Sequence, residues 1–171
     1  NVVRVADVHS AVPVHAGFVA YHVAMGDYRR AIEIGDAGLA LVDRTGYLAW
    51  GIHRLLPMTI EAALWMGDRD TARRYEARLR KDSLQLGHKL GIAWADTCDG
   101  LIAMLDRDYE KAAPLLRKSA EALEAIPWLL DAARVRRKLA WVLAKLGDLE
   151  GATRELRRAH DAFLRMRAEV E

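Results

Sequence analysis

Apolar side chains recur at helical spacing along most of the chain. In the segment before Gly147 they form one i, i+4, i+7, i+8, i+11 series, made of Val135, Leu139, Val142, Leu143 and Leu146. Residues at this spacing lie on one face of a helix, so an amphipathic helix is predicted there. No segment shows the alternation of apolar and polar residues that is typical of strands, and the pattern therefore predicts an all-α protein.

Two further segments repeat this helical spacing. The apolar series are Ala112, Leu116, Ser119 and Leu123 after Arg107, and Ala152, Leu156, Ala159 and Phe163 after Gly147. Because each series covers only one face, each helix needs a neighbour against which that face is buried. The pattern therefore predicts helices that pack in pairs.

Residues that start or end helices divide the chain at an even spacing. They are Gly26, Gly46, Gly67, Gly87, Pro127 and Gly147, with gaps of 20, 21, 20, 40 and 20 residues. The gap of 40 residues has Arg107 at its midpoint, inside a segment that otherwise matches the glycine turns. A fixed period of this kind is the sequence signature of a repeat protein.

The turns share the pattern Gly-Asp-x-x-x-Ala, at residues 26–31, 67–72 and 147–152, with a degenerate copy at residues 107–112. Glycine can adopt the left-handed conformation that ends a helix, and aspartate can cap the next one. The alanine is small enough for paired helices to approach closely. Short turns between helices of equal length predict antiparallel hairpins, which stack in tandem. We expect a single domain over residues 1–171, an α-α superhelix (solenoid) of about four hairpins at residues 8–45, 46–86, 87–126 and 127–169.

This turn pattern resembles that of the tetratricopeptide-repeat (TPR-like) family, with a period near 40 residues where the family has 34. The longer period also leaves a HEAT-like array open. The tail from Leu156 to Met166 resembles the last repeats of maltose-regulator and LuxR-type bacterial transcription activators and related signalling ATPases. The resemblance implies a binding module of a larger signalling or transcription-regulating protein.

The composition narrows the class of protein. The chain has 171 residues, 26 basic and 24 acidic side chains, and 52% hydrophobic residues. The single cysteine, Cys98, excludes a disulfide framework and a thiolate zinc site, and a buried, inert thiol is expected. We expect a cytoplasmic segment of a larger protein, because no apolar run is long enough to span a membrane, no signal-peptide pattern is present and Asn1 is not an initiator methionine.

The sequence lacks the motifs of common catalytic sites. It has no phosphate-binding loop, no dinucleotide glycine fingerprint, no His-Glu-x-x-His and no serine elbow. Of the six histidines, His15 and His22 could share a helix face, but no carboxylate or cysteine stands at ligand spacing. We therefore expect no catalytic residues, no metal site and no cofactor.

The tryptophans suggest a binding surface. Trp50, Trp65, Trp94, Trp128 and Trp141 all fall in the predicted first helices of hairpins. In tetratricopeptide arrays the first helices line the groove, so the resemblance implies an aromatic groove. Burial between neighbouring helices is the alternative for each tryptophan.

Trp141 stands apart from the apolar series of its helix. At 100° per residue it falls on the face of Arg134, Arg137, Lys138 and Lys145. Aligning the repeats places two earlier sets at corresponding positions, Arg54, Met58 and Trp65 in one repeat and Trp94, Thr97 and Cys98 in the next. This predicts a groove that is apolar and aromatic in its middle and basic at one end. The alternative is a further repeat that covers Trp141, with the basic residues as its solvated rim.

These features favour a noncatalytic module that binds a protein or a peptide, for which an acidic segment fits the basic end, or that senses a small effector. A nucleic-acid-binding repeat and a structural oligomerisation module are the alternatives. Interleaved Asp and Glu residues weaken any stripe that could follow phosphates, so nucleic acid is not the expected partner. Self-association through exposed array ends is a further route to assembly.

Overall fold

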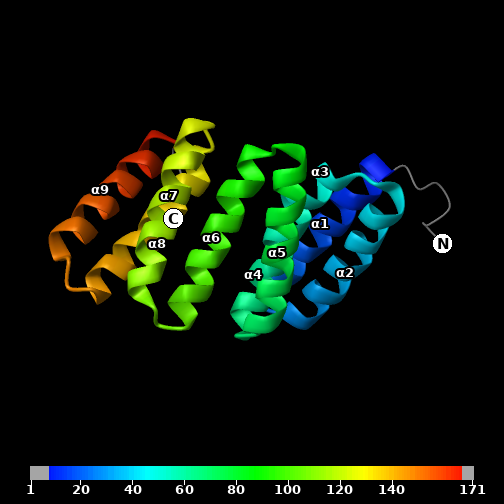
Figure 1. Cartoon of the computed structure of the whole chain (residues 1–171), viewed down its shortest axis with the longest axis horizontal. Coiled ribbons are helices and arrows are strands. Elements are labelled where there is room, and N and C mark those ends of the chain that lie inside the picture. Colours follow the sequence, from blue (N-terminus) through cyan, green and yellow to red (C-terminus); the bar gives the residue numbers. More distant parts are fainter. Residues whose placement is uncertain (1–7, 167–171) are drawn as a thin grey trace. The chain divides into compact units, whose positions relative to one another are not determined.

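The computed structural model describes residues 8–166, and all regular structure in that range is helical (Figure 1). The helices are α1 (Val8–Ala24), α2 (Tyr28–Thr45), α3 (Leu48–Trp50), a π-helical turn (Gly51–Leu55), α4 (Leu56–Met66), α5 (Arg69–Leu86), α6 (Lys89–Leu105), α7 (Tyr109–Ala125), α8 (Leu129–Lys145) and α9 (Leu149–Arg165). Consecutive segments pair into hairpins, with α3, the π-helical turn and α4 acting as one first helix. The predicted all-α array of helical hairpins is confirmed. Residues 167–169 of the last predicted repeat lie outside the described range.

The turns use the left-handed backbone that the spacing predicted. Five glycines have positive φ angles, namely Gly26 (75°), Gly46 (72°), Gly67 (72°), Gly87 (60°) and Gly147 (84°). Arg107, at the degenerate turn, has φ of 59° and thus holds the position that glycine holds elsewhere. A side chain is disfavoured there, because its Cβ crowds the following carbonyl.

Each aspartate that follows these turns caps the next helix. The side chains of Asp27, Asp68, Asp108 and Asp148 accept hydrogen bonds from the backbone N–H groups of Arg30, Thr71, Lys111 and Gly151. These bonds satisfy amide groups that have no partner inside the helix. The bonds from Thr71 lower the pKa of Asp68. The capping role inferred from the Gly-Asp pattern is confirmed at all four positions.

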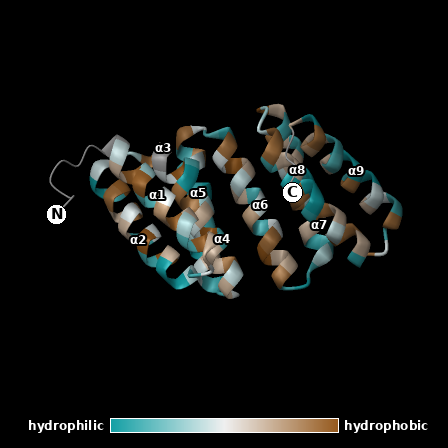
Figure 2. Cartoon of the chain, turned by 180° about the vertical axis from the view of Figure 1, so that it is seen from behind, coloured by the Kyte–Doolittle hydropathy of each residue, from teal (hydrophilic) through white to brown (hydrophobic). Residues whose placement is uncertain are grey.

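Most side chains in the interior of the hairpins are apolar, and many of them are small alanines. The alanines predicted to allow close approach are fully buried at Ala31, Ala72 and Ala112, while Ala152 is only partly covered. Figure 2 shows hydrophobic and hydrophilic residues alternating around the helices, as one-sided burial requires. Within residues 8–166 no helix combines the length and apolarity needed to cross a membrane.

The π-helical turn Gly51–Leu55 directly precedes α4, whose second residue is Pro57. Proline has no amide hydrogen and cannot donate to a carbonyl one turn earlier, so the helical ladder is interrupted here. π-helical turns inside α-helices are a recognised cause of such interruptions. The irregular turn carries His53 and Arg54.

The chain forms two compact units, Asn1–Ala95 (unit 1) and Asp96–Glu171 (unit 2). In unit 1, α2 packs against both its hairpin partner α1 and the first helix of the next hairpin, α4. In unit 2, α8 packs against α7 of the preceding hairpin and against its own partner α9. The second helix of a hairpin thus contacts the first helix of the next one within each unit.

Candidate functional site

The candidate site is one face of α8, here called the α8 surface and made of Arg134, Arg137, Lys138, Trp141 and Lys145. The opposite face of α8 is buried, through Ala132, Ala133, Val135, Arg136, Leu139, Ala140, Val142 and Leu143. The α8 surface keeps Arg137 and Lys145 exposed and Arg134 and Lys138 partly exposed. The indole of Trp141 is 45% exposed, which is high for the largest apolar side chain.

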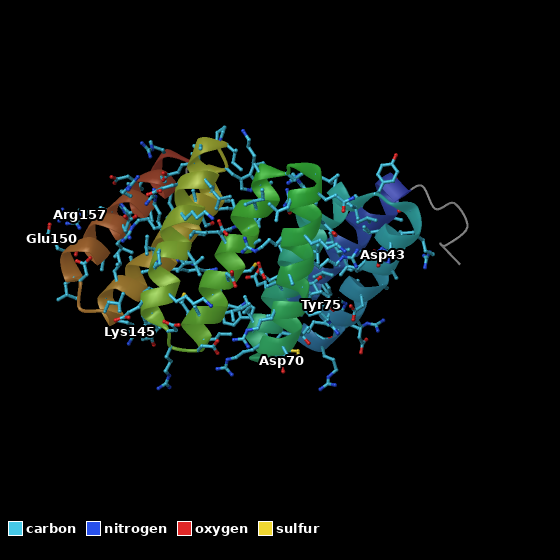
Figure 3. All side chains as sticks on the ribbon, in the orientation of Figure 1. Asp43, Asp70, Tyr75, Lys145, Glu150 and Arg157 are labelled. Atoms are coloured by element: carbon cyan, nitrogen blue, oxygen red, sulfur yellow. The ribbon has the colours of Figure 1, made fainter. Side chains whose placement is uncertain are left out.

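Two neighbours hold the indole of Trp141 in place. The ring of Tyr109, from the start of α7, meets it edge to face, with 5.6 Å between ring centroids and 81° between planes. Lys145 lies near the end of α8 (Figure 3). Its ammonium nitrogen is 5.2 Å from the centroid of the indole. The Tyr109 contact fixes the ring, and the cation is attracted to its negatively polarised face. The result is an ordered aromatic platform with positive charge beside it.

One cation of the α8 surface, Arg134, forms an ion pair with an acidic residue of the same helix. A nitrogen of the Arg134 guanidinium lies 3.5 Å from an oxygen of Asp131, and the Arg134 side chain is 43% exposed. The Asp131 side chain is 17% exposed, so it is the Arg134 end of this pair that is open to water and to a ligand carboxylate. A guanidinium can also donate two parallel hydrogen bonds to one carboxylate.

Arg136 lies on the buried face of α8, and nothing in the spacing of the apolar residues predicted this. Its side chain is 1% exposed, and its Nε and Nη2 donate to the two carboxylate oxygens of Glu124 in α7, at 2.6 and 2.7 Å. Its Nη1 donates to Glu155 of α9 at 2.5 Å. Burial opposes the charged guanidinium, but the bonds to Glu124 and Glu155 outweigh it and raise the pKa of Arg136.

The bond from Arg136 is also the largest influence on Glu124, and it lowers the pKa of this carboxyl. Glu124 and Glu155 therefore neutralise the buried guanidinium internally. The ion pairs of Arg136 join α7, α8 and α9. The cations of the α8 surface lie instead on the exposed side of α8.

The remaining predicted site residues belong to unit 1. Trp65 of α4 is 64% exposed, and its ring stacks on Tyr28 at the start of α2, with centroids 6.3 Å apart and planes at 11°. Arg54 is exposed on the π-helical turn, while Met58 and Trp94 are partly buried. One groove that joins these residues to the α8 surface stays a prediction.

Tyr28 and Tyr109 are additions that the structure makes to the site. Each follows a capping aspartate directly, and each contacts a tryptophan of the next hairpin's first helix. The Asp-Tyr pair at both turns could have indicated this. Trp128 is the N-cap of α8, one residue before the helix, and the side chain of Trp50 lies outside the described ones.

Burial removes some groove positions that the repeat alignment suggested. Thr97 and Cys98 of α6 are 2% and 4% exposed, and the Thr97 hydroxyl bonds to that of Ser119, with 2.5 Å between oxygens. Neither lines an open surface. The expected buried thiol at Cys98 is confirmed. In the described part of the chain, no three His, Cys, Asp or Glu side chains converge as metal ligands would.

Comparisons with known proteins support the fold. No protein-family model matches the chain, and no curated protein matches its sequence. Among solved structures, the crystal structure of BtubC (BKLC) from P. vanneervenii is similar, with a TM-score of 0.73 and 13% identity over 96% of this chain and 67% of that one. At this identity the likeness shows a shared helical fold.

Proposed function

We propose that this chain is a noncatalytic helical-repeat module that binds an acidic segment of a partner protein on the α8 surface. The segment we have in mind is a short peptide with Asp or Glu side chains, or a free C-terminal carboxylate, next to an apolar residue. The resemblance to tetratricopeptide arrays of bacterial regulators extends the proposal to a cytoplasmic signalling or transcription-regulating protein.

The observation that carries the proposal is Trp141, which stays 45% exposed among cations although α8 has a fully formed buried face. Exposed large aromatic side chains are uncommon, and Trp and Arg are enriched among the residues that dominate binding energy. The edge contact from Tyr109 orders the indole before a ligand arrives, which reduces the entropy lost on binding.

Charge favours an acidic ligand over a neutral one. Arg134, Arg137, Lys138 and Lys145 supply donors along one side of α8, and the helix itself contains a single acidic residue, Asp131. Guanidinium groups bind carboxylates through paired hydrogen bonds that are stronger than neutral ones. The indole adds an apolar contact for the side chain beside the carboxylate.

The test uses a fluorescein-labelled peptide of alternating Glu and Leu with a free C-terminus, titrated with the chain and followed by fluorescence anisotropy. Neutralising two guanidiniums with Arg134→Gln and Arg137→Gln should weaken binding about tenfold or more, because each lost charged hydrogen bond costs roughly 1.5–3 kcal/mol. Trp141→Ala should also weaken binding of the peptide, without changing how binding depends on salt.

The control removes the same charge elsewhere in unit 2, with Arg117→Gln and Arg157→Gln. Both residues are exposed, on α7 and α9, and Figure 3 labels Arg157 on the outward side of α9. The control should bind within about twofold of the unaltered chain, since diffuse attraction is screened by salt. Equal losses in both double variants, or tighter binding of a random DNA duplex than of the peptide, would reject the site.

A further inference from the structure

The outer face of α1 carries apolar side chains at positions that are buried in two later first helices, α4 and α8. Phe18 stands eight residues before the left-handed Gly26, as Thr59 does before Gly67 and Leu139 before Gly147. Thr59 and Leu139 are fully buried, whereas Phe18 is 55% exposed. The α1 helix thus has the pattern of an internal first helix but lacks its cover among the described residues.

The same holds five residues before the turn. Tyr21 is 57% exposed, while Ala62 of α4 and Val142 of α8 are fully buried at this position. Together with Phe18 and Val14, Tyr21 forms an exposed apolar stripe at i, i+4 and i+7. We call these three residues the head face.

Inside the array, the second helix of the preceding hairpin covers this stripe. The α2 helix packs on α4, and Gly35 of α2 lies so close that a Cβ built on it would be 2.7 Å from Cγ2 of Thr59. The α7 helix packs on α8 in the same order along the chain. The head face therefore matches the type of surface that a second helix covers.

The α9 helix carries the complementary surface. Leu156 is the eighth residue of α9, as Gly35 is of α2 and Leu116 of α7. Gly35 is buried beside Thr59 of α4, and Leu116 is buried with its side chain against Gly100 of α6, whereas Leu156 is 53% exposed. Leu149 is the first residue of α9 and is exposed, at the position from which Tyr28 and Tyr109 contact the next hairpin. We call Leu149 and Leu156 the tail face.

We propose that the tail face of one copy docks on the head face of a second copy, and so continues the contact that α2 makes with α4. The shared register places Leu156 against Phe18, as it places Gly35 near Thr59. A hollow of about 430 Å³, lined in part by Val14, Phe18, Ile34 and Ala37, gives the incoming leucine room beside the head face. The ionisable residues that line this hollow are His15, His22, Arg30 and Glu33, and the last two carry opposite charges.

The two faces are different, so the contact is heterologous and leaves a free head and a free tail after each addition. Sedimentation of the whole chain from about 1 µM to about 1 mM should show an average mass that rises past the dimer. Phe18→Glu with Tyr21→Glu, and Leu149→Glu with Leu156→Glu, should each give monomers. An equal mixture of the two variants should stop at a dimer, because one intact head meets one intact tail.

Leu84→Glu is the control, since Leu84 is an exposed leucine of α5 that belongs to neither face, and it should associate like the unaltered chain. As a second readout, Phe18→Cys mixed with Leu156→Cys should form an intermolecular disulfide faster than Met25→Cys mixed with Leu156→Cys, with circular dichroism verifying the fold. A monomer at every concentration, a dimer that survives in either face variant alone, or equal cross-linking of both pairs would overturn the proposal.

Discussion

The two units build the same hairpin architecture with different packing devices. In unit 1, α2 approaches α4 through Gly35, whose Cα faces the buried side chain of Thr59. In unit 2, α7, α8 and α9 are joined by Arg136, which is buried and bonded to Glu124 and Glu155. In unit 1, the absence of a side chain at Gly35 lets the backbones of α2 and α4 come close. In unit 2, the long, charged side chain of Arg136 fills the space between the helices.

The comparison shows that hairpin geometry does not dictate how the space between hairpins is filled. Glycine permits a close approach but adds no attraction of its own, so its contacts depend on shape alone. A buried guanidinium needs partners, and it fixes helices from two hairpins through directional bonds. The α2–α4 contact at Gly35 and the Arg136 contacts should therefore respond differently to substitutions that alter volume and to those that alter charge.

The largest expected effect is that of Arg136→Ala. Two carboxylates lose their partner and a cavity forms, so the free energy of unfolding should fall by about 3 kcal/mol. Urea denaturation measures the loss, and hydrogen exchange should place it in α7, α8 and α9. The combined variant Arg136→Met, Glu124→Gln and Glu155→Leu should recover most of the stability, because no unpaired charge remains buried.

Acid provides an independent check on the role of Arg136. Its guanidinium lowers the pKa of Glu124, so this stabilisation is present above the ordinary carboxyl pKa of about 4.3 and is lost as pH falls through the lowered value. The stability gap between the unaltered chain and Arg136→Ala should narrow between about pH 5 and pH 3. A gap that stays constant over this range would assign the loss to packing alone.

The next effect in size is that of Gly35→Ala in unit 1. A methyl group there would overlap Thr59, whose hydroxyl is held by a 2.7 Å bond to the Leu55 carbonyl. Overpacking of this kind costs about 1–3 kcal/mol, partly offset by the better helix propensity of alanine, so a net loss of roughly 1–2 kcal/mol is expected in urea.

Two variants separate crowding from helix propensity. Gly17→Ala, in α1, has no atom within 4 Å of the new Cβ and should stabilise the chain by up to about 1 kcal/mol. Thr59→Ala removes the atoms that the new methyl group would overlap. Gly35→Ala should therefore cost less stability when it is made in a Thr59→Ala chain than when it is made in the unaltered chain. A loss of stability in Gly17→Ala would contradict the assumption that alanine's better helix propensity stabilises these helices.

The smallest effect concerns the turns. Arg107 has φ of 59° where unit 1 uses Gly87 at 60°. Arg107→Gly should raise the melting temperature and stabilise the chain by up to about 1 kcal/mol, because glycine adopts this conformation without a Cβ penalty. Gly87→Ala should change stability by a similar amount in the opposite direction. A clear loss of stability in Arg107→Gly would mean that its side chain makes a contact worth more than the strain.

The sequence by itself determined the helices and the turns between them. The even spacing of Gly26, Gly67 and Gly147, each followed by aspartate, predicted left-handed ends and capped starts, and both are observed. These features depend on neighbours within one turn of the chain, so local residue types suffice to specify them. The amphipathic series likewise predicted the faces that α7 and α8 bury.

The tertiary structure alone decided which exceptions to the pattern are stable. A charged side chain is normally exposed, so the residue type alone predicts that Arg136 faces water. Its burial depends on Glu124 and Glu155, which lie 12 and 19 residues away in the chain. Leu156 continues an apolar series and was expected to be buried, yet it is exposed because no helix packs on that side of α9 among the described residues. Periodicity specifies which face of a helix is apolar, but only the packed neighbours determine whether water reaches it.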